Sequence, residues 1–168
     1  MKRLLPPLLV AALLVSGCGL RPLYAGGEHS PVVQALSGVE VAPIPGRAGW
    51  LVRTALVDRL RASGTARYRL EVELDDQITG FGVRRDSAVT RERRTLRARY
   101  RLVDAESGSS TVLVDATAGS DAGIDVVGSE YATVAAEQSA LERLSADIAD
   151  QIVTRLALYA SRTASTGH

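Results

Sequence analysis

The 168-residue sequence has one cysteine, one lysine, two histidines and few aromatic residues. A single cysteine has no partner for an intramolecular disulfide. No cysteine and histidine set has the spacing of a metal site, and no glycine-rich phosphate loop follows a strand pattern. No apolar run approaches the roughly 20 residues that cross a bilayer. We therefore expect a chain that is not an enzyme, holds no metal or cofactor and has no membrane-spanning helix.

The N-terminus has the composition of an export signal. Lys2-Arg3 precedes a short apolar run, Leu4–Val15, and the small pair Ser16-Gly17 follows. Positive charge, a short apolar stretch and then small residues are typical of a secretory signal peptide. We expect residues 1–17 to be removed on export.

Cys18 follows this signal, and three interpretations of the unpaired thiol compete. A catalytic thiolate would need a nearby base, but His29 lies in a linker and His168 is the last residue. A small apolar residue inside a signal that is cut further on would simply be discarded. The stretch "VSGC" instead matches the bacterial lipobox, in which the cysteine becomes the lipidated N-terminus. We favour lipidation at Cys18, with several acyl chains that make anchoring effectively permanent.

Beyond Cys18 the sequence predicts a tether, one domain and a short tail. Residues 18–37 mix glycine, proline and charge and are expected to hold the domain off the bilayer. Residues 38–160 have the size of one domain. Residues 161–168 are polar and are expected to be disordered.

Hydrophobic periodicity predicts strand, helix, three strands and helix in residues 38–160. A strand over Gly38–Ile44 and a helix over Arg47–Ser63 come first. The predicted strands then run from Tyr68 to about Ile78, around Leu96–Leu102, and over Thr111–Ala118. The segment 79–87 contains glycine and charge and is expected to be a loop or an irregular hairpin tip. The segment 119–129 is rich in glycine and aspartate and is expected to be a solvated loop and not a calcium site.

A long amphipathic helix is expected from Ser129–Glu130 to about Tyr159, because neither proline nor glycine interrupts an apolar stripe. The stripe consists of Leu141, Leu144, Ile148, Ile152, Leu156 and Tyr159. The predicted fold is an α+β two-layer sandwich, with two amphipathic helices on one face of a mainly antiparallel four-stranded sheet.

The charges are unevenly distributed along the chain. Eight arginines and two acids lie between Arg84 and Arg101, a local charge of +6, whereas residues 121–150 carry −6. Arginines alternate with apolar residues around Leu96–Leu102, so they are expected on the open face of the sheet, where Glu71 and Glu73 could oppose them on a neighbouring strand.

Five stretches together resemble the LptE family of outer-membrane lipopolysaccharide-assembly lipoproteins, in its alphaproteobacterial form. They are "CGLRPLY", "VRTALVDRL", "YRLEVELDD", "TRERRTLRARYRLVDAESG" and "SEYATVAAEQSALERLSADIADQIVTRL". The resemblance implies two helices on one face of a four-stranded sheet. It also implies a plug inside the β-barrel translocon LptD, which assists barrel assembly and delivery of lipopolysaccharide to the outer leaflet. Gly19 after the cysteine is typical of sorting to the outer membrane, so we expect a lipid-anchored protein on its periplasmic face.

The basic segment suggests a ligand site for this role, because guanidinium groups match the geometry of phosphates. The candidate lipopolysaccharide-binding residues are Arg84, Arg85, Arg91, Arg93 and Arg94. For Arg97, Arg99 and Arg101 we favour surface ion pairs. Nucleic-acid binding is not expected without interleaved aromatic residues. The alternative function is a generic periplasm-facing scaffold lipoprotein that binds another envelope protein.

Overall fold

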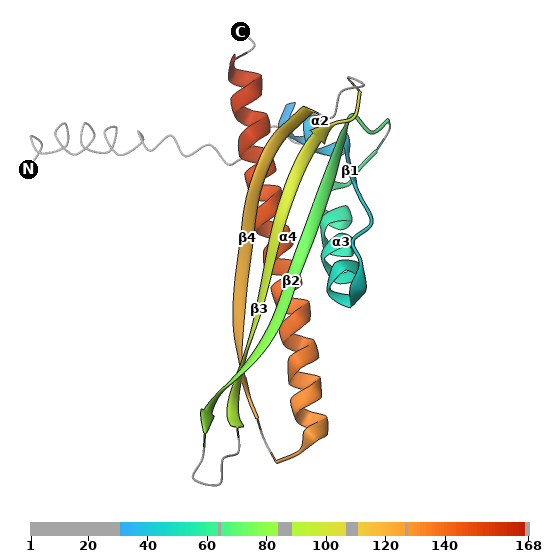
Figure 1. Cartoon of the computed structure of the whole chain (residues 1–168). Helices are drawn as coiled ribbons and strands as arrows, with labels where there is room; N and C mark the ends of the chain where they lie inside the picture. Colours follow the sequence, from blue (N-terminus) through green and yellow to red (C-terminus); the bar gives the residue numbers. More distant parts are fainter. Residues whose placement is uncertain (1–30, 64, 84–88, 107–110, 127, 167–168) are drawn as a thin grey trace, which may run out of the picture.

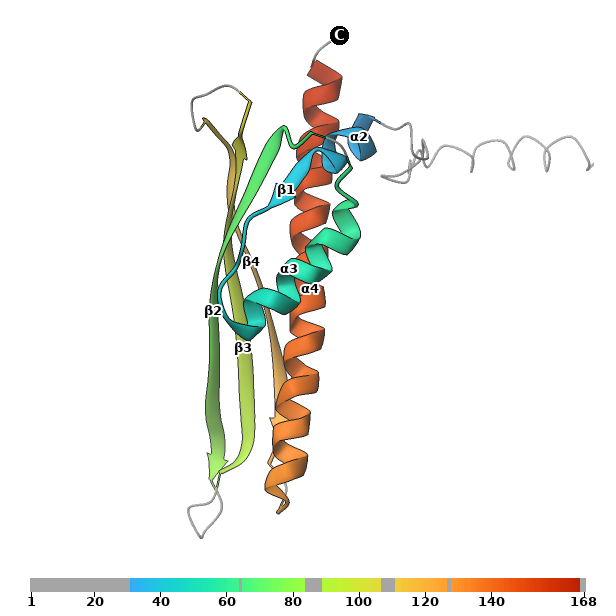
Figure 2. The same cartoon turned by 90° about the vertical axis from the view of Figure 1, so that its right-hand side faces the viewer.

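The computed structural model describes residues 31–63, 65–83, 89–106, 111–126 and 128–166. Its elements, in chain order, are α2 (Pro31–Ser37), β1 (Val39–Val41), α3 (Gly46–Leu60), β2 (Tyr68–Val83), β3 (Val89–Asp104), β4 (Thr111–Asp125) and α4 (Glu130–Thr166). The strands form a sheet in the order β1-β2-β3-β4, and the helices lie along one of its faces (Figures 1 and 2).

The sheet is antiparallel except at one edge. β1 runs parallel to β2 over three residues, whereas β2 with β3 and β3 with β4 form long antiparallel ladders. β1 is short because proline at residues 43 and 45 supplies no backbone N–H for the ladder. The predicted α+β sandwich with a mainly antiparallel four-stranded sheet is confirmed.

The core lies between the sheet and α3 and α4. Leu70, Leu96 and Leu102 project from the sheet and are fully or almost fully buried. The expected stripe of α4 lies opposite them, with Leu141, Leu144, Ile148, Ile152 and Leu156 all buried. The period of 3.6 in the helices and of 2 in the strands therefore identified most of the core correctly. No helix in the described part of the chain is long and apolar enough to cross a membrane.

Helix α3 ends three residues before the predicted stop at Ser63. Arg61 has a left-handed backbone conformation (φ 48°), and its N–H donates to the Val57 carbonyl oxygen at 3.1 Å. This hydrogen bond closes the last turn. At the other end of α3, Gly49 packs so closely on the Ile44 backbone that a side chain would collide with it.

The strands extend beyond the sequence prediction. Residues 79–83 complete β2, where a loop or an irregular hairpin tip was expected, and residues 119–125 complete β4, where a loop was expected. Their register explains the difference, because Phe81 pairs with Arg91 and Asp125 pairs with the other side of Arg91. Backbone pairing with the central strand β3 thus outweighs the weak strand preference of glycine and aspartate.

Both ends of the folded domain also extend further than expected. Pro31–Ser37, placed in the tether by the sequence, forms α2, and its Leu36 is 5% exposed within the core. At the other end, α4 continues through Ser161 to Thr166, within the segment expected to be disordered. Burial of one apolar side chain fixes α2, whereas the last turns of α4 continue the uninterrupted helical ladder. Residues 1–17, Cys18 and the rest of the tether lie outside the described residues.

Candidate functional site

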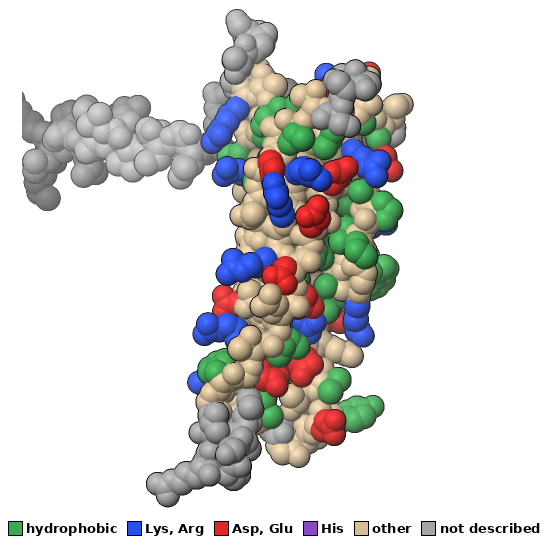
Figure 3. All heavy atoms as spheres, viewed as in Figure 1, with side chains coloured by type: hydrophobic (Ala, Val, Ile, Leu, Met, Phe, Trp, Pro, Cys, Tyr) green, Lys and Arg blue, Asp and Glu red, His purple; other side chains and the backbone are tan. Residues whose placement is uncertain are grey.

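The face of the sheet that points away from the helices is charged along its length. Arginine and acidic side chains are interspersed on it, so no large region has a single sign (Figure 3). The odd-numbered residues of β2, β3 and β4 supply these side chains, since successive residues of a strand point to opposite faces.

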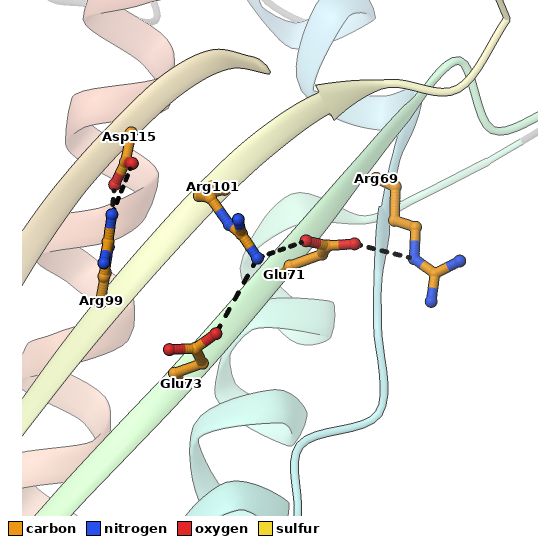
Figure 4. A network of polar contacts seen from close by, with 6 residues as sticks. All are labelled: Arg69, Glu71, Glu73, Arg99, Arg101 and Asp115. Atoms are coloured by element: carbon orange, nitrogen blue, oxygen red, sulfur yellow. Dashed lines mark hydrogen bonds and ion pairs between the residues drawn. The ribbon is translucent and has the colours of Figure 1, made fainter. Parts of the chain in front are cut away.

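This face carries a network of ion pairs near the start of β2 and the end of β3 (Figure 4). The register places Glu71 opposite Arg101 and Glu73 opposite Arg99, as the alternation predicted. Arg101 lies 3.3 Å from Glu71 and 3.9 Å from Glu73, while Arg99 turns to Asp115 on β4 at 2.9 Å. The prediction that Arg99 and Arg101 form surface ion pairs is confirmed. Arg97 has no ion pair among the residues described.

The pair of Arg99 and Asp115 stabilises the charged forms of both groups. The hydrogen bonds from Arg99 lower the pKa of Asp115, and the same bonds raise the pKa of Arg99. Both groups are largely solvent-exposed, and solvent screening limits what such a pair contributes to stability. The network therefore keeps the open face polar and contributes little to holding the fold together.

The three candidate arginines that the structure describes do not form one cluster. Arg84 and Arg85 lie outside the described residues. Arg91 and Arg93 lie on the open face near the end of the sheet and are 64% and 59% exposed. Arg91 lies 2.9 Å from Asp125, and Arg93 lies 3.8 Å from Asp121. Their exposure leaves the guanidinium groups accessible to a ligand in spite of these acids.

Arg94 lies on the opposite face, under α4. Its side chain is only 12% exposed, and its guanidinium donates two hydrogen bonds to the carboxylate of Asp76 on β2. Those bonds raise the pKa of Arg94 against the effect of burial. The geometry makes Arg94 a link between sheet and helix, so it is the least accessible of the three described candidates.

Apolar side chains accompany the arginines at this end of the molecule. Phe81 is 40% exposed, and Arg93 lies over its ring at 5.5 Å from the ring centre. Ile78 is also exposed, as are Tyr131 and Val134 in the first turns of α4. We call Ile78, Phe81, Arg91, Arg93, Tyr131 and Val134 the tip. Cationic and apolar groups occur together there.

The sequence analysis missed the acidic partners of these arginines. Asp121 and Asp125 alternate with Ala122 and Ile124, which is the period of a strand, but the glycines of the segment led to a loop prediction. Asp76 lies within the predicted strand from Tyr68 to about Ile78, but its pairing with Arg94 was not predicted. The period-2 alternation in residues 118–125 predicts a strand, and it would have placed Asp121 and Asp125 beside the arginines.

Comparison with known proteins agrees with this geometry. The family model LptE, described as lipopolysaccharide-assembly, matches residues 36–156. A solved lipoprotein from Caulobacter crescentus is 29% identical, with a TM-score of 0.66 over 80% of this chain and 98% of the other. An uncharacterised protein of Rickettsia prowazekii is 26% identical over 152 residues, 90% of this chain and 94% of its own.

More distant solved structures share the fold alone. The minor lipoprotein of Acinetobacter baumannii is 14% identical, with a TM-score of 0.59 over 73% of this chain and 92% of its own. The rare lipoprotein B of Shewanella oneidensis is 13% identical, with a TM-score of 0.52 over 77% and 98%. The family match covers most of the chain and includes every described strand, all of α3 and most of α4. The chain therefore belongs to the LptE family of lipopolysaccharide-assembly lipoproteins, which are structural proteins and not enzymes.

Proposed function

We propose that this protein is an outer-membrane lipoprotein that plugs the LptD β-barrel translocon, helps the barrel assemble and aids lipopolysaccharide delivery to the outer leaflet. The observation that carries the proposal is the family match over residues 36–156, together with the same fold in a solved lipoprotein. The anchor would be Cys18, acylated after removal of residues 1–17, on the periplasmic face of the membrane.

The shape and surface of the domain support a plug. The 37 residues of α4 span about 55 Å, and the 16-residue strands β2 and β3 about 53 Å, so the molecule is a long, narrow wedge. Its open sheet face carries interspersed charges and their ion pairs. The lumen of a large outer-membrane barrel is polar, and a plug within it needs a polar surface of this kind.

The tip supports contact with lipopolysaccharide. This lipid is an amphiphile whose phosphates suit guanidinium groups and whose acyl chains suit exposed apolar side chains. Arg91 and Arg93 would contact the phosphates together with Arg84 and Arg85, while Phe81 and Ile78 would contact apolar parts of the ligand. Arg94 is a poorer candidate, since Asp76 already occupies its guanidinium.

Purification of the native complex tests the proposal. The full chain with a C-terminal affinity tag would be recovered from detergent-solubilised outer membranes, and the bound proteins identified by mass spectrometry. We expect an LptD-type barrel in near-stoichiometric amount. Recovery of a different envelope protein instead would favour the alternative, a generic periplasm-facing scaffold lipoprotein, and recovery of no barrel would reject the plug.

A further inference from the structure

The two free edges of the sheet differ in what covers them. At the β4 edge, the side-chain amide of Gln151 on α4 bonds both backbone groups of Gly119. The Gly119 N–H donates to Oε1 at 3.3 Å, and Nε2 donates to the Gly119 carbonyl oxygen at 3.1 Å. The Ser120 hydroxyl donates a hydrogen bond to the carboxylate of Asp147 on the same helix at 3.1 Å. The helix thus occupies the backbone groups that an added strand would need at the middle of β4.

The edge of β2 is open along its second half. The Tyr68 N–H donates to the Gly38 carbonyl oxygen, and the Leu70 carbonyl oxygen accepts from Ala42, so even-numbered residues of β2 face this edge. By the alternation of an antiparallel ladder, Leu74, Asp76 and Ile78 also present their N–H and C=O groups there. In the described structure no backbone hydrogen bond meets this side of β2 beyond Leu70, and β1 and α3 flank only its upper part (Figure 1).

The side chains along this open edge select the strand that can join it. Glu73 is 76% exposed, and its nearest arginine, Arg101, lies 3.9 Å away. Among the described residues, the Asp75 carboxylate is hydrogen-bonded only by the Gln77 amide. Both acids lie on the open face of the sheet. A second copy of this chain would bring its own acids against them, and like charges on adjacent strands are destabilising. An incoming strand with arginine or lysine on this face would instead be attracted.

The other face of the same edge favours apolar side chains. Leu74 is partly buried against the core and Ile78 is 43% exposed, so both leave apolar surface beside the edge. A suitable strand therefore alternates basic residues on one face with apolar residues on the other. Wall strands of a closed barrel have no free backbone groups, so the segment must come from a loop or a domain outside the barrel wall.

We propose that residues 72–80 of β2 accept an extended basic segment of the partner protein as a fifth strand, whereas Gln151 closes β4 to such addition. The inference rests on the proposed function, because the partner is taken to be the LptD-type barrel protein. Main-chain hydrogen bonds would supply affinity, and the acids Glu73 and Asp75 would supply selectivity, as in other cases of strand addition.

A proline at one edge position tests this directly. Ile78→Pro removes an outward N–H and places the ring against an incoming strand, while the pairing of β2 with β3 keeps its hydrogen bonds. Gly123→Pro is the matched control. Gly123 lies four residues after Gly119 on β4, so its N–H, like that of Gly119, points away from β3. With the tagged full chain in native membranes, we expect Ile78→Pro to lower the recovered barrel protein about tenfold, a loss of roughly one backbone hydrogen bond. Gly123→Pro should leave it unchanged.

A charge variant covers the case in which the proline disturbs folding. Glu73→Arg with Asp75→Arg should give a similar loss of barrel protein, with the circular dichroism spectrum retained, and Asp121→Arg on the other edge should not. If folded Ile78→Pro and the double arginine variant both recover as much barrel protein as the wild type does, the edge assignment is wrong. The proposed function would then be unaffected. Absence of the barrel from the wild-type sample would instead reject the proposed function, and the edge assignment with it.

Discussion

Arg94 and Asp76 form a bidentate pair beneath α4, with N–O distances of 2.8 and 2.6 Å. A third hydrogen bond runs from Nη1 of Arg94 to the carbonyl oxygen of Glu137 at 3.0 Å. One guanidinium therefore joins β3, β2 and α4. The pair is shielded from water, in contrast to the arginines of the open face.

Loss of this arginine should destabilise the fold. Arg94→Gln would leave the Asp76 carboxylate, only 25% exposed, without its charged partner and would remove the bond to Glu137. We expect the free energy of unfolding to fall by about 2 kcal/mol, measured by denaturant titration. Arg91→Gln removes an exposed pair and should cost less than about 0.5 kcal/mol. Equal losses in both variants would contradict the structural role of Arg94.

Ligand binding should depend on the candidate arginines other than Arg94. We expect the variant with glutamine at Arg84, Arg85, Arg91 and Arg93 to bind purified lipopolysaccharide at least about tenfold more weakly, because charged contacts to phosphate are lost. Its circular dichroism spectrum and melting temperature should stay the same. A control with glutamine at Arg97, Arg99 and Arg101 tests whether position or only net charge matters. Unchanged affinity in the first variant would reject the site.

Attachment to the membrane should depend on Cys18. Cys18→Ser removes the only thiol, so thioether formation is impossible, and we expect an unprocessed or soluble protein. Mass spectrometry of the native protein should find the acylated cysteine as the first residue. An intact protein without lipid would overturn the interpretation of "VSGC" as a lipobox.

The start of α3 should tolerate no side chain at Gly49. A Cβ there would lie 2.7 Å from the carbonyl carbon of Ile44, and this backbone cannot rotate away as a flexible side chain could. We expect Gly49→Ala to lower the free energy of unfolding by about 1–3 kcal/mol. Gly123→Ala, where no atom lies within 4 Å of the added carbon, is the control and should be close to neutral.

The contact between α3 and α4 should weaken in acid. Arg59 on α3 donates hydrogen bonds to Asp150 on α4, and these bonds lower the pKa of Asp150 in the folded state. The unfolded chain therefore binds the proton more readily. The contribution of the pair is complete above the ordinary aspartate pKa of about 4 and is lost as the pH falls below it through the folded pKa.

Urea unfolding at neutral pH and near pH 3 measures this effect. Asp150→Asn should lose part of the acid sensitivity of the wild type. The difference should stay below about 1 kcal/mol, because the Asp150 side chain is 64% exposed. Identical pH dependence in the two proteins would contradict the pair's contribution.

Local periodicity carried most of the fold prediction. Leu144, Ile148 and Ile152 share one side of α4 because a helix turns every 3.6 residues, and Arg99 and Arg101 share one side of β3 because a strand alternates. Both patterns depend only on neighbours in the chain. The alternation also placed Glu71 and Glu73 opposite the arginines, since one register satisfies the apolar faces of both strands.

The ends of elements and the candidate site depended on long-range contacts. Asp121 and Asp125 belong to β4 because β3 lies beside them. Strand alternation places Arg94 on the face opposite Arg91 and Arg93, and Arg94 is covered because α4 packs on that face. Gln151 is an ordinary polar residue of a helix until Gly119, 32 residues earlier, is brought to its amide. The sequence by itself determined the four strands, the two long helices and most of the core, because these follow from residue types and spacing. Only the tertiary structure decided which arginines stay accessible and which sheet edge stays open, because both depend on segments that meet after folding.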